Sequence, residues 1–245
     1  AKVDFDRMFE YSSKKKKKTE GLEVSNIARI EVKNLDFRFN GRSKLLNDVS
    51  LKLEKGKITC LLGESGNGKT TFAEILQKNY IQEKGEIIIN RSINLNEISI
   101  SNWRKHISVV PQNIQLFNGT VLENIILDEH LDEQKLQSVI NLGFEKFINS
   151  LPQNILTIVG EEGVNLSGGQ KQLLGWMRAL YHNPQFLILD EPTSSLDKEN
   201  RDFIYKLIDK LKDTTIIFII SHHLEDLKNI STDIYLLKDT RLKII

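Results

Sequence analysis

The sequence predicts an α/β fold: a mostly parallel sheet with helices on its faces, an N-terminal antiparallel β subdomain and an inserted α-helical subdomain. Apolar runs of strand length occur at residues 58–62, 186–189 and 215–220, and such continuous runs are typical of parallel strands buried on both faces. Helical spacing follows the first two runs, at 70–77 and 197–211. Because strands and helices alternate, a parallel sheet is expected.

The first residues differ in composition from the rest of the chain. We expect residues 1–26 to be a partly disordered, basic linker, because an uninterrupted lysine run extends from Lys14 to Lys18. Val3 and Met8, near the start, have the spacing of one face of a short helix. A solvated linker is the plainer interpretation of the lysine run. A basic segment drawn to anionic lipid beside a membrane is the alternative.

Residues 27–245 are expected to form the folded domain. Short alternating runs near its start, separated by turn residues, predict the antiparallel sheet. Between residues 121 and 182 the apolar residues recur mostly with helical spacing, and we place the helical subdomain at about 113–183. The strands expected besides the three apolar runs are 30–32, 35–39, 49–53, 86–89, 107–110 and 234–237.

Composition and charge exclude several functional classes. The formal net charge is +1, so no overall field attracts nucleic acid, and we expect no nucleic-acid partner. The single cysteine, Cys60, lies in an apolar run and is expected to be a small buried hydrophobe without a disulfide. No apolar run reaches the roughly 20 residues that cross a bilayer. The N-terminus also lacks the apolar segment of a signal peptide.

A glycine-rich loop joins the first buried strand to the helix after it, and it fits the pattern G-x-x-x-x-G-K-[ST]. Its glycines let successive backbone N–H groups face one phosphate, and the helix start presents further N–H groups to the same anion. Lys69 supplies a cation for the β- and γ-phosphates, and the Thr70 hydroxyl is a ligand for Mg²⁺. The loop therefore predicts a P-loop NTPase core. Its residues are Gly63, Glu64, Ser65, Gly66, Asn67, Gly68, Lys69 and Thr70.

Two carboxylates follow the apolar run at 186–189. Asp190 and Glu191 are expected at the carboxyl edge of the sheet, where ligands bind in open α/β folds and where the phosphate loop also lies. We expect Asp190 to hold Mg²⁺ through water, and Glu191 to orient and deprotonate the attacking water. Considered alone, the pair is equally explained as helix-capping or solvent-facing acids, and the phosphate loop favours the catalytic role.

The segment Leu-Ser-Gly-Gly-Gln precedes a long helical stretch, where it either caps the helix or offers a second surface to an anion. The order of the phosphate loop, Gln112, this segment, Leu-Ile-Leu-Asp-Glu and His222 resembles the ATP-binding-cassette (ABC) ATPases over about residues 27–245. The resemblance implies ATP and Mg²⁺ as ligands, and a head-to-tail homodimer. In this dimer the segment, called the signature in this family, closes over the nucleotide of the other protomer. Its residues are Ser167, Gly168, Gly169 and Gln170.

The resemblance also assigns residues by position. It implies that Gln112 senses Mg²⁺ and contacts a membrane domain, and that His222, directly after Ser221, contacts the γ-phosphate and positions the water. Phe39 corresponds to an aromatic residue that stacks on adenine. Tyrosine is more usual there, so the stacking is retained but a hydroxyl is lost. The further residues implied to bind nucleotide are Phe39, Thr71 at the end of the phosphate loop, and Asp197 in the loop that links the two sites of the dimer.

Two stretches resemble the exporter branch of the family, at residues 116–121 and 157–163. This likeness implies contact with the transmembrane domain of the same transporter, at the cytoplasmic face of the cell membrane. It also makes the first residues the expected end of a membrane helix. Phe117 and Trp103 are either part of this contact or plain core aromatics. Residues 144–163 are similar to peptidase-containing peptide and bacteriocin exporters, so a peptide is the expected cargo.

Two rival hypotheses come from other functional classes. A soluble ABC ATPase acting on nucleic acid or ribosomes would not need the exporter-type stretches, and salt-dependent nucleic-acid binding would support it. A regulatory nucleotide-binding module without turnover is opposed by the presence of both Glu191 and His222. The guanine-selecting pattern Asn-Lys-x-Asp is absent from the sequence, so a GTPase is not expected.

Overall fold

A computed structural model describes residues 21–127, 129–161, 163–222 and 230–245. The expectations for the first part of the linker, including the helix of Val3 and Met8 and the lysine run, therefore lie outside the described residues. Within the described part of the chain, every helix is too short or too polar to cross a bilayer.

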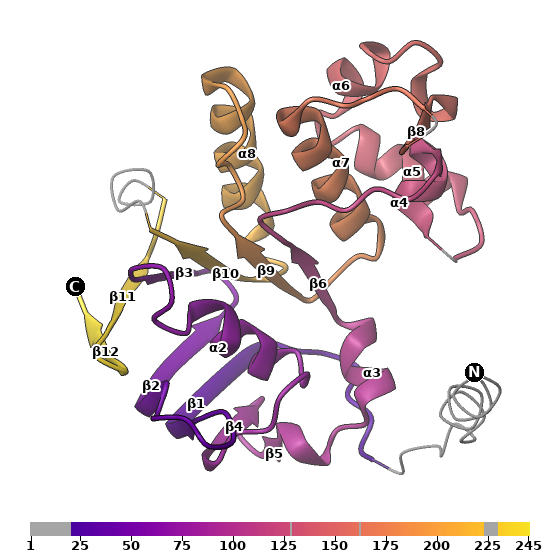
Figure 1. Ribbon diagram of the computed structural model, residues 1–245. Coiled ribbons are helices and arrows are strands. Elements are labelled where there is room, and N and C mark those ends of the chain that lie inside the picture. The colour runs from indigo at the N-terminus through magenta and orange to yellow at the C-terminus, as the bar shows by residue number, and fades with distance from the viewer. Residues whose placement is uncertain (1–20, 128, 162, 223–229) are drawn as a thin grey trace, which may run out of the picture.

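A six-stranded sheet occupies the middle of the molecule, in the order β12-β11-β3-β10-β9-β6 (Figure 1). Neighbours from β11 to β6 run parallel, and β12 joins antiparallel to β11. The predicted parallel core is thus confirmed. Its strands are β3 (Ile58–Leu62), β6 (Ile107–Val110), β9 (Phe186–Asp190), β10 (Ile216–Ser221), β11 (Asp233–Lys238) and β12 (Arg241–Ile244).

Alternating side chains of the parallel strands pack into two cores, one on each face of the sheet. Phe218 of β10 packs on one face against helix α2 (Lys69–Leu76), where its ring meets that of Phe72 at a centroid distance of 5.9 Å. Ile219, the next residue, packs on the other face with helices α7 (Gly168–Tyr181) and α8 (Lys198–Leu211). Burial on both faces explains why these strands are apolar without interruption.

An antiparallel sheet of order β2-β1-β4-β5 packs against the core that contains Phe218 and helix α2. The predicted run 30–32 and residues 35–37 of the predicted run 35–39 belong to one strand, β1, because an irregularity between Val32 and Leu35 lets the chain continue along the same neighbours. The predicted second run was therefore two residues too long. Asn34, inside it, has a left-handed backbone with φ of 48°. The strands are β1 (Arg29–Phe37), β2 (Leu46–Glu54), β4 (Lys84–Ile89) and β5 (Ile93–Asn94); η1 (Leu95–Glu97) and α3 (Ile100–Lys105) then lead to β6.

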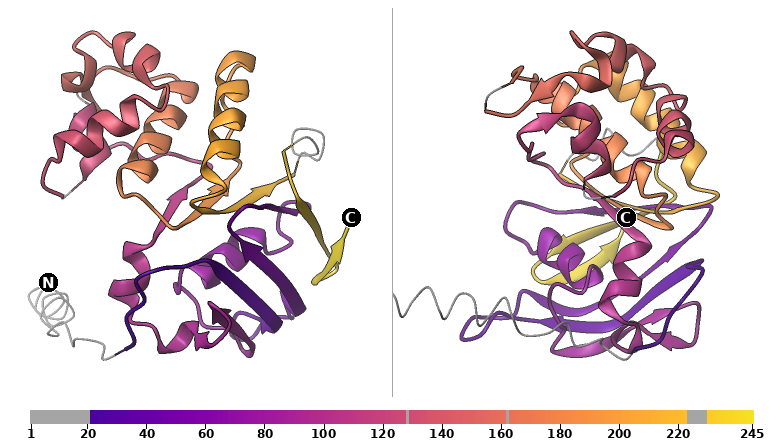
Figure 2. Two further views of the ribbon diagram at one scale, coloured as in Figure 1. Left: turned by 180° about the vertical axis from the view of Figure 1, so that it is seen from behind. Right: turned by 90° about the vertical axis from the view of Figure 1, so that its right-hand side faces the viewer.

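The helical subdomain lies at the opposite end of the molecule from the antiparallel sheet, and the six-stranded sheet lies between them (Figures 1 and 2). A small antiparallel pair, β7 with β8, also lies in this region, and the helical pattern did not predict it. The elements are β7 (Gly119–Thr120), α4 (Val121–Ile126), α5 (Glu133–Ile140), α6 (Glu145–Asn149), η2 (Asn154–Leu156), β8 (Ile158–Val159) and α7.

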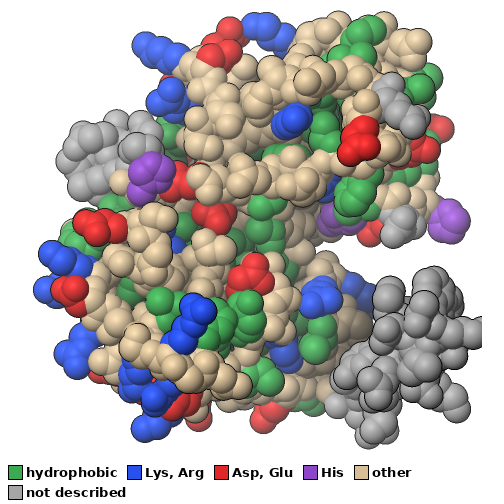
Figure 3. Space-filling view, in the orientation of Figure 1, with side chains coloured by type: hydrophobic (Ala, Val, Ile, Leu, Met, Phe, Trp, Pro, Cys, Tyr) green, Lys and Arg blue, Asp and Glu red, His purple; other side chains and the backbone are tan. Residues whose placement is uncertain are grey.

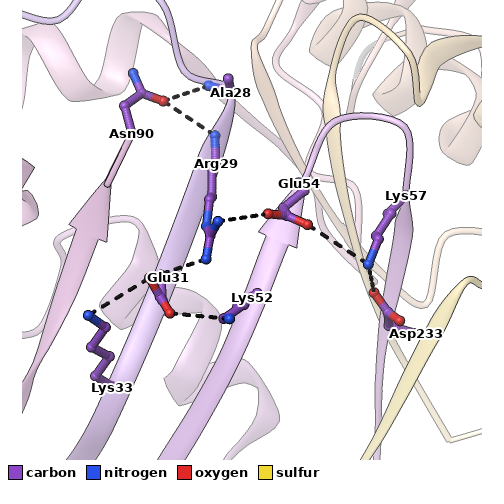
Figure 4. Close-up of polar contacts among 9 residues, drawn as sticks. All are labelled: Ala28, Arg29, Glu31, Lys33, Lys52, Glu54, Lys57, Asn90 and Asp233. Carbon is purple, nitrogen blue, oxygen red and sulfur yellow. Dashed lines mark hydrogen bonds and ion pairs between the residues drawn. The ribbon is translucent and has the colours of Figure 1, made fainter. Parts of the chain in front are cut away.

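A row of ion pairs crosses the surface where the two sheets meet (Figure 4). Arg29 contacts Glu54 at 3.3 Å, Glu54 contacts Lys57 at 3.8 Å, and Lys57 reaches Asp233 of β11 at 3.3 Å. Such partly exposed pairs contribute little individually. On the face seen in Figure 3, Lys and Arg side chains lie among Asp and Glu side chains, as expected for a nearly neutral chain.

Candidate nucleotide site

The phosphate loop connects the end of β3 to the start of α2, as the sequence predicted. Gly66 and Gly68 have left-handed backbones, with φ of 84° and 97°. At Gly68 a β-carbon would also lie 2.8 Å from the Leu45 side chain, so both the backbone conformation and the close packing favour glycine there. The Lys69 ammonium folds back over the loop and donates hydrogen bonds to the carbonyls of Gly63 at 2.6 Å and Glu64 at 2.9 Å.

Three strand ends meet at one edge of the sheet and bring the predicted site residues together. In register, Leu62 at the end of β3 pairs with Ser221, and Asp190 at the end of β9 pairs with Ile220. The Thr70 hydroxyl donates to an Asp190 carboxylate oxygen over 3.4 Å. Thus β3 leads to the phosphate loop, β9 to the two acids, and β10 to His222.

The electrostatics of this edge are dominated by burial. Burial raises the pKa of the Asp190 carboxyl, and the neighbouring Glu191 raises it further, while the Thr70 hydroxyl and Lys69 act in the opposite direction. Burial lowers the pKa of Lys69, against the attraction of Glu191 and Asp190. Partly buried ionisable groups whose pKa values are shifted by burial and by neighbouring charges, such as Asp190 and Lys69, are typical of functional sites.

Glu191 is 7% exposed and has a left-handed backbone with φ of 50°, which is unusual for a residue with a side chain. The Ser221 hydroxyl donates to one of its carboxylate oxygens at 3.1 Å, and the ring nitrogen Nδ1 of His222 lies 2.5 Å from the other. Its carboxylate is therefore fixed in direction by β10. His223, the next residue along the chain, lies outside the described residues.

A cleft of about 1190 Å³ opens over this edge and gathers most of the predicted nucleotide-binding and catalytic residues. Asn67 does not line it, since its side-chain amide donates to the Leu237 carbonyl at 3.2 Å and ties the loop to β11. The predicted residues that line the cleft are Phe39, Gly63, Glu64, Ser65, Gly66, Gly68, Lys69, Thr70, Thr71, Gln112, Asp190, Glu191 and His222.

The segment after Phe39 also lines the cleft, from Arg42 to Leu45, and the sequence analysis missed it. Its position beside the predicted stacking residue was the only available signal. Phe39 itself is partly buried and makes edge-to-face contacts with Phe37, at a centroid distance of 5.1 Å, and with Tyr80, at 5.5 Å. Phe37 is buried and belongs to the core.

The signature segment lies apart from this cleft within the chain. Ser167 caps α7: its hydroxyl accepts from the Gln170 N–H at 3.2 Å, and the Gln170 side chain accepts from the Ser167 N–H at 2.9 Å. Ser167 and Gly168 are exposed. Together with Gly169, Gln170 and Asp197 they line a second hollow of about 780 Å³. The structure therefore does not bring the signature to the phosphate loop of the same chain.

The aromatic residues left open by the sequence analysis fall into different environments. Trp103 is fully buried, and its indole N–H donates to the Leu76 carbonyl at 2.8 Å, so it is a core residue. Phe117 is 58% exposed and lies under the Arg178 guanidinium, with 5.5 Å from guanidinium carbon to ring centroid. Gln112 is exposed where it lines the cleft.

The oxygen ligands at this edge fit a magnesium ion that arrives with a nucleotide. Mg²⁺ commonly takes one or two protein oxygens together with substrate phosphates. Thr70 and Asp190 supply a hydroxyl and a carboxylate 3.4 Å apart, and Gln112 adds an amide to the same cleft.

Comparisons with known proteins agree with this geometry. Residues 46–194 match the family described as ABC transporter. The chain is 38% identical over 204 residues to an ATP-dependent lipid A-core flippase of Haemophilus influenzae (strain 86-028NP), and 37% identical over 204 residues to the flippase of that name from Aromatoleum aromaticum. Each alignment covers 82% of this chain, but only 35% and 34% of the relatives, so the chain spans about a third of their length.

A solved structure is similar over nearly the whole chain. It is described as a bacterial Atm1-family ABC exporter with ATP bound. The TM-score is 0.86 at 27% sequence identity, and the match covers 98% of this chain and 43% of that one. The predicted fold class, with its antiparallel β subdomain and helical insertion, is confirmed by this likeness and by the sheet topology.

Proposed function

This chain belongs to the ABC transporter family, and we propose that it is the ATPase domain of an exporter, acting at the cytoplasmic face of a membrane. One observation carries the assignment: a single cleft gathers a phosphate loop, a buried carboxylate and a histidine in contact with that carboxylate. These groups suit in-line attack of water on a γ-phosphate.

In the proposed reaction, the N–H groups of the phosphate loop and Lys69 bind the phosphates. Lys69 exchanges its two carbonyl partners for phosphate oxygens. Glu191 orients the attacking water and accepts its proton, while His222 contacts the γ-phosphate. Thr70, Asp190 and Gln112 would hold Mg²⁺, which when bound neutralises phosphate charge.

We further propose that two copies act head to tail. Ser167 and Gly168 are exposed at the start of α7 and outside the cleft of their own chain, so a second chain must bring them to a phosphate. The helix start offers N–H groups and a favourable dipole to that anion. Asp197 lies beside them in the second hollow and would sit at the same interface.

The rest of the transporter and its cargo are also matters of proposal. We propose residues 27–245 as the ATPase domain, with the helical subdomain at about 113–183, and residues 1–26 as the linker from a transmembrane domain. The resemblance of residues 144–163 to peptidase-containing exporters indicated a peptide cargo. The two relatives named above are lipid A-core flippases, which supports a lipid-like cargo instead.

Nucleotide hydrolysis by the chain tests this assignment. We expect Mg²⁺-dependent release of phosphate from ATP, and its loss in Lys69→Ala, because the phosphates lose their cation. Lys206→Ala is the matched control, since Lys206 is exposed on α8 and is not among the residues that line the cleft. No phosphate release by the parent chain at any protein concentration, or equal release by both variants, contradicts the assignment.

A further inference from the structure

We propose that Gln172, a buried residue of α7, is a positioning residue that fixes the catalytic glutamate and the following loop to the signature helix. The inference rests on the proposed ATPase function, in which Glu191 is the base. It concerns how that base is held, which neither the motifs nor the comparisons address.

The Gln172 side chain is 2% exposed and uses both ends of its amide on one segment of backbone. Its N–H₂ group donates to the Glu191 carbonyl at 2.9 Å, and its oxygen accepts from the Ser195 N–H at 3.0 Å. One helical turn further, the Trp176 indole N–H donates to the Pro192 carbonyl at 3.2 Å. The same face of α7 thus binds two consecutive carbonyls after β9.

These bonds hold Glu191 in a conformation that it would not readily adopt alone. A left-handed backbone is unfavourable for a residue with a side chain, so it persists where the surroundings impose it. The Glu191 N–H is bound to the Ile220 carbonyl at 3.0 Å, and its C=O is bound to Gln172. Together, β10 and α7 therefore set the direction of the carboxylate.

The first residues of α7, one turn before Gln172, contact the same loop. A β-carbon on Gly169 would lie 3.1 Å from the Ser195 carbonyl oxygen, and one on Gly168 would lie 3.4 Å from the Ser195 β-carbon. Ser195 therefore lies between the signature glycines and the Gln172 amide. Because an α-helix is rigid over this length, the signature, Ser195 and the backbone of Glu191 are tied into one unit.

This arrangement has a consequence for the proposed dimer. The signature of a chain would touch the nucleotide held by its partner, whereas Glu191 acts on the nucleotide held by its own chain. Gln172 is the side chain whose two hydrogen bonds join these structures within one protomer. Contact between the signature of one chain and its partner's nucleotide would thereby influence the position of Glu191 in that same chain, and Glu191 acts on the other nucleotide of the dimer.

The experiment replaces Gln172 by a residue that has no amide group but keeps the approximate shape of the side chain. Gln172→Met removes both hydrogen bonds, and we expect kcat for ATP hydrolysis to fall by about 10-fold or more, because a small displacement of a catalytic group has large effects. KM for ATP should stay within about 2-fold, since the phosphate loop that holds the nucleotide of the same chain lies between β3 and α2, not on α7.

The matched control is Gln185→Met. Gln185 also uses both ends of its amide on backbone, with the oxygen accepting from the Ile27 N–H at 2.5 Å and the nitrogen donating to the Ser25 carbonyl at 2.9 Å. It precedes β9, whereas Glu191 follows β9. We expect this variant to lose thermal stability to a similar degree and to keep kcat.

Hydrogen exchange at the Ser195 amide, measured on the same proteins, needs no turnover. We expect faster exchange in Gln172→Met and parent-like exchange in Gln185→Met. An unchanged kcat in Gln172→Met, or equal losses of kcat in both variants, overturns the inference. If the parent chain hydrolyses no ATP, the proposed function fails instead, and unchanged exchange at Ser195 then overturns the positioning role separately.

Discussion

Replacing the proposed base while keeping its size is the sharpest perturbation of the site. Glu191→Gln retains a carbonyl oxygen to accept from the Ser221 hydroxyl, at 3.1 Å in the parent, and keeps the backbone bonds to Ile220 and Gln172. What it loses is the ability to accept a proton from water. The substitution therefore separates chemistry from architecture.

The two expected effects differ in size. A positioned general base contributes about 10²–10⁴-fold to rate, so kcat should fall by that factor, or about 3–5 kcal/mol in activation free energy. Affinity for ATP should hold or increase, because Glu191 adds to the effect of burial in raising the pKa of Asp190, and removal of its charge makes the cleft less repulsive to phosphates.

Phosphate release in a single turnover, together with ATP binding by calorimetry, measures both quantities. Glu145→Gln is the control, because Glu145 is exposed at the start of α6 and its loss removes the same charge. Hydrolysis by Glu191→Gln within about 3-fold of the parent would refute the assignment of Glu191 as base. A loss of ATP binding equal to the loss of rate would show that the residue holds the nucleotide instead.

Three further predictions follow from single contacts. Phe39→Ala should raise the Kd for ATP about 2–10-fold by removing a stacking ring, whereas Phe39→Tyr should leave it unchanged, as calorimetry would show. Asp36→Asn should lower the free energy of unfolding at pH 7 by about 1–2 kcal/mol, since Asp36 accepts from Lys44 at 2.6 Å and from the Asp48 N–H at 2.8 Å. Burial raises the pKa of the Cys60 thiol to about 12, so a thiol reagent at pH 8 should label it only after unfolding; labelling of the folded chain would contradict this.

The Asp36 prediction has a defined pH dependence. The Lys44 hydrogen bond lowers the pKa of this carboxyl below its ordinary value near 3.8. A lowered carboxyl pKa stabilises the fold above the unfolded value, and that contribution disappears as pH falls through the folded value. Urea unfolding of parent and Asp36→Asn should therefore differ at pH 7 and converge below about pH 4; a constant difference would mean that the pair is not responsible.

A strand that is buried on both faces can be recognised in the sequence by its continuous apolar residues. A strand that is exposed carries no such pattern. The strands β3, β9 and β10 are continuous apolar runs, and all three were predicted as strands of a parallel sheet. β12 was missed because it is polar and follows the turn Asp239–Thr240. Both turn residues have positive φ, at 50° and 67°, without the glycine that usually marks such a turn.

Those parts of the candidate site that are formed by local sequence motifs could be predicted. The phosphate loop and the acids after β9 are local patterns, and the edge at which they meet follows from the parallel sheet. By contrast, Gln172 lies one turn inside α7, and its contacts with Glu191 and Ser195 depend on the packing of that helix against the β9 end. A buried glutamine in a helix has no spacing signal, so only the structure could identify it.

A structure of the Glu191→Gln chain with Mg-ATP tests the central claim most directly. The account predicts phosphates on the N–H groups after β3, Lys69 moved from the Gly63 and Glu64 carbonyls onto them, and the exposed Ser167 of a second copy at the γ-phosphate. A nucleotide bound elsewhere, or held in this cleft while the Ser167 of every copy remains in solvent, would contradict it.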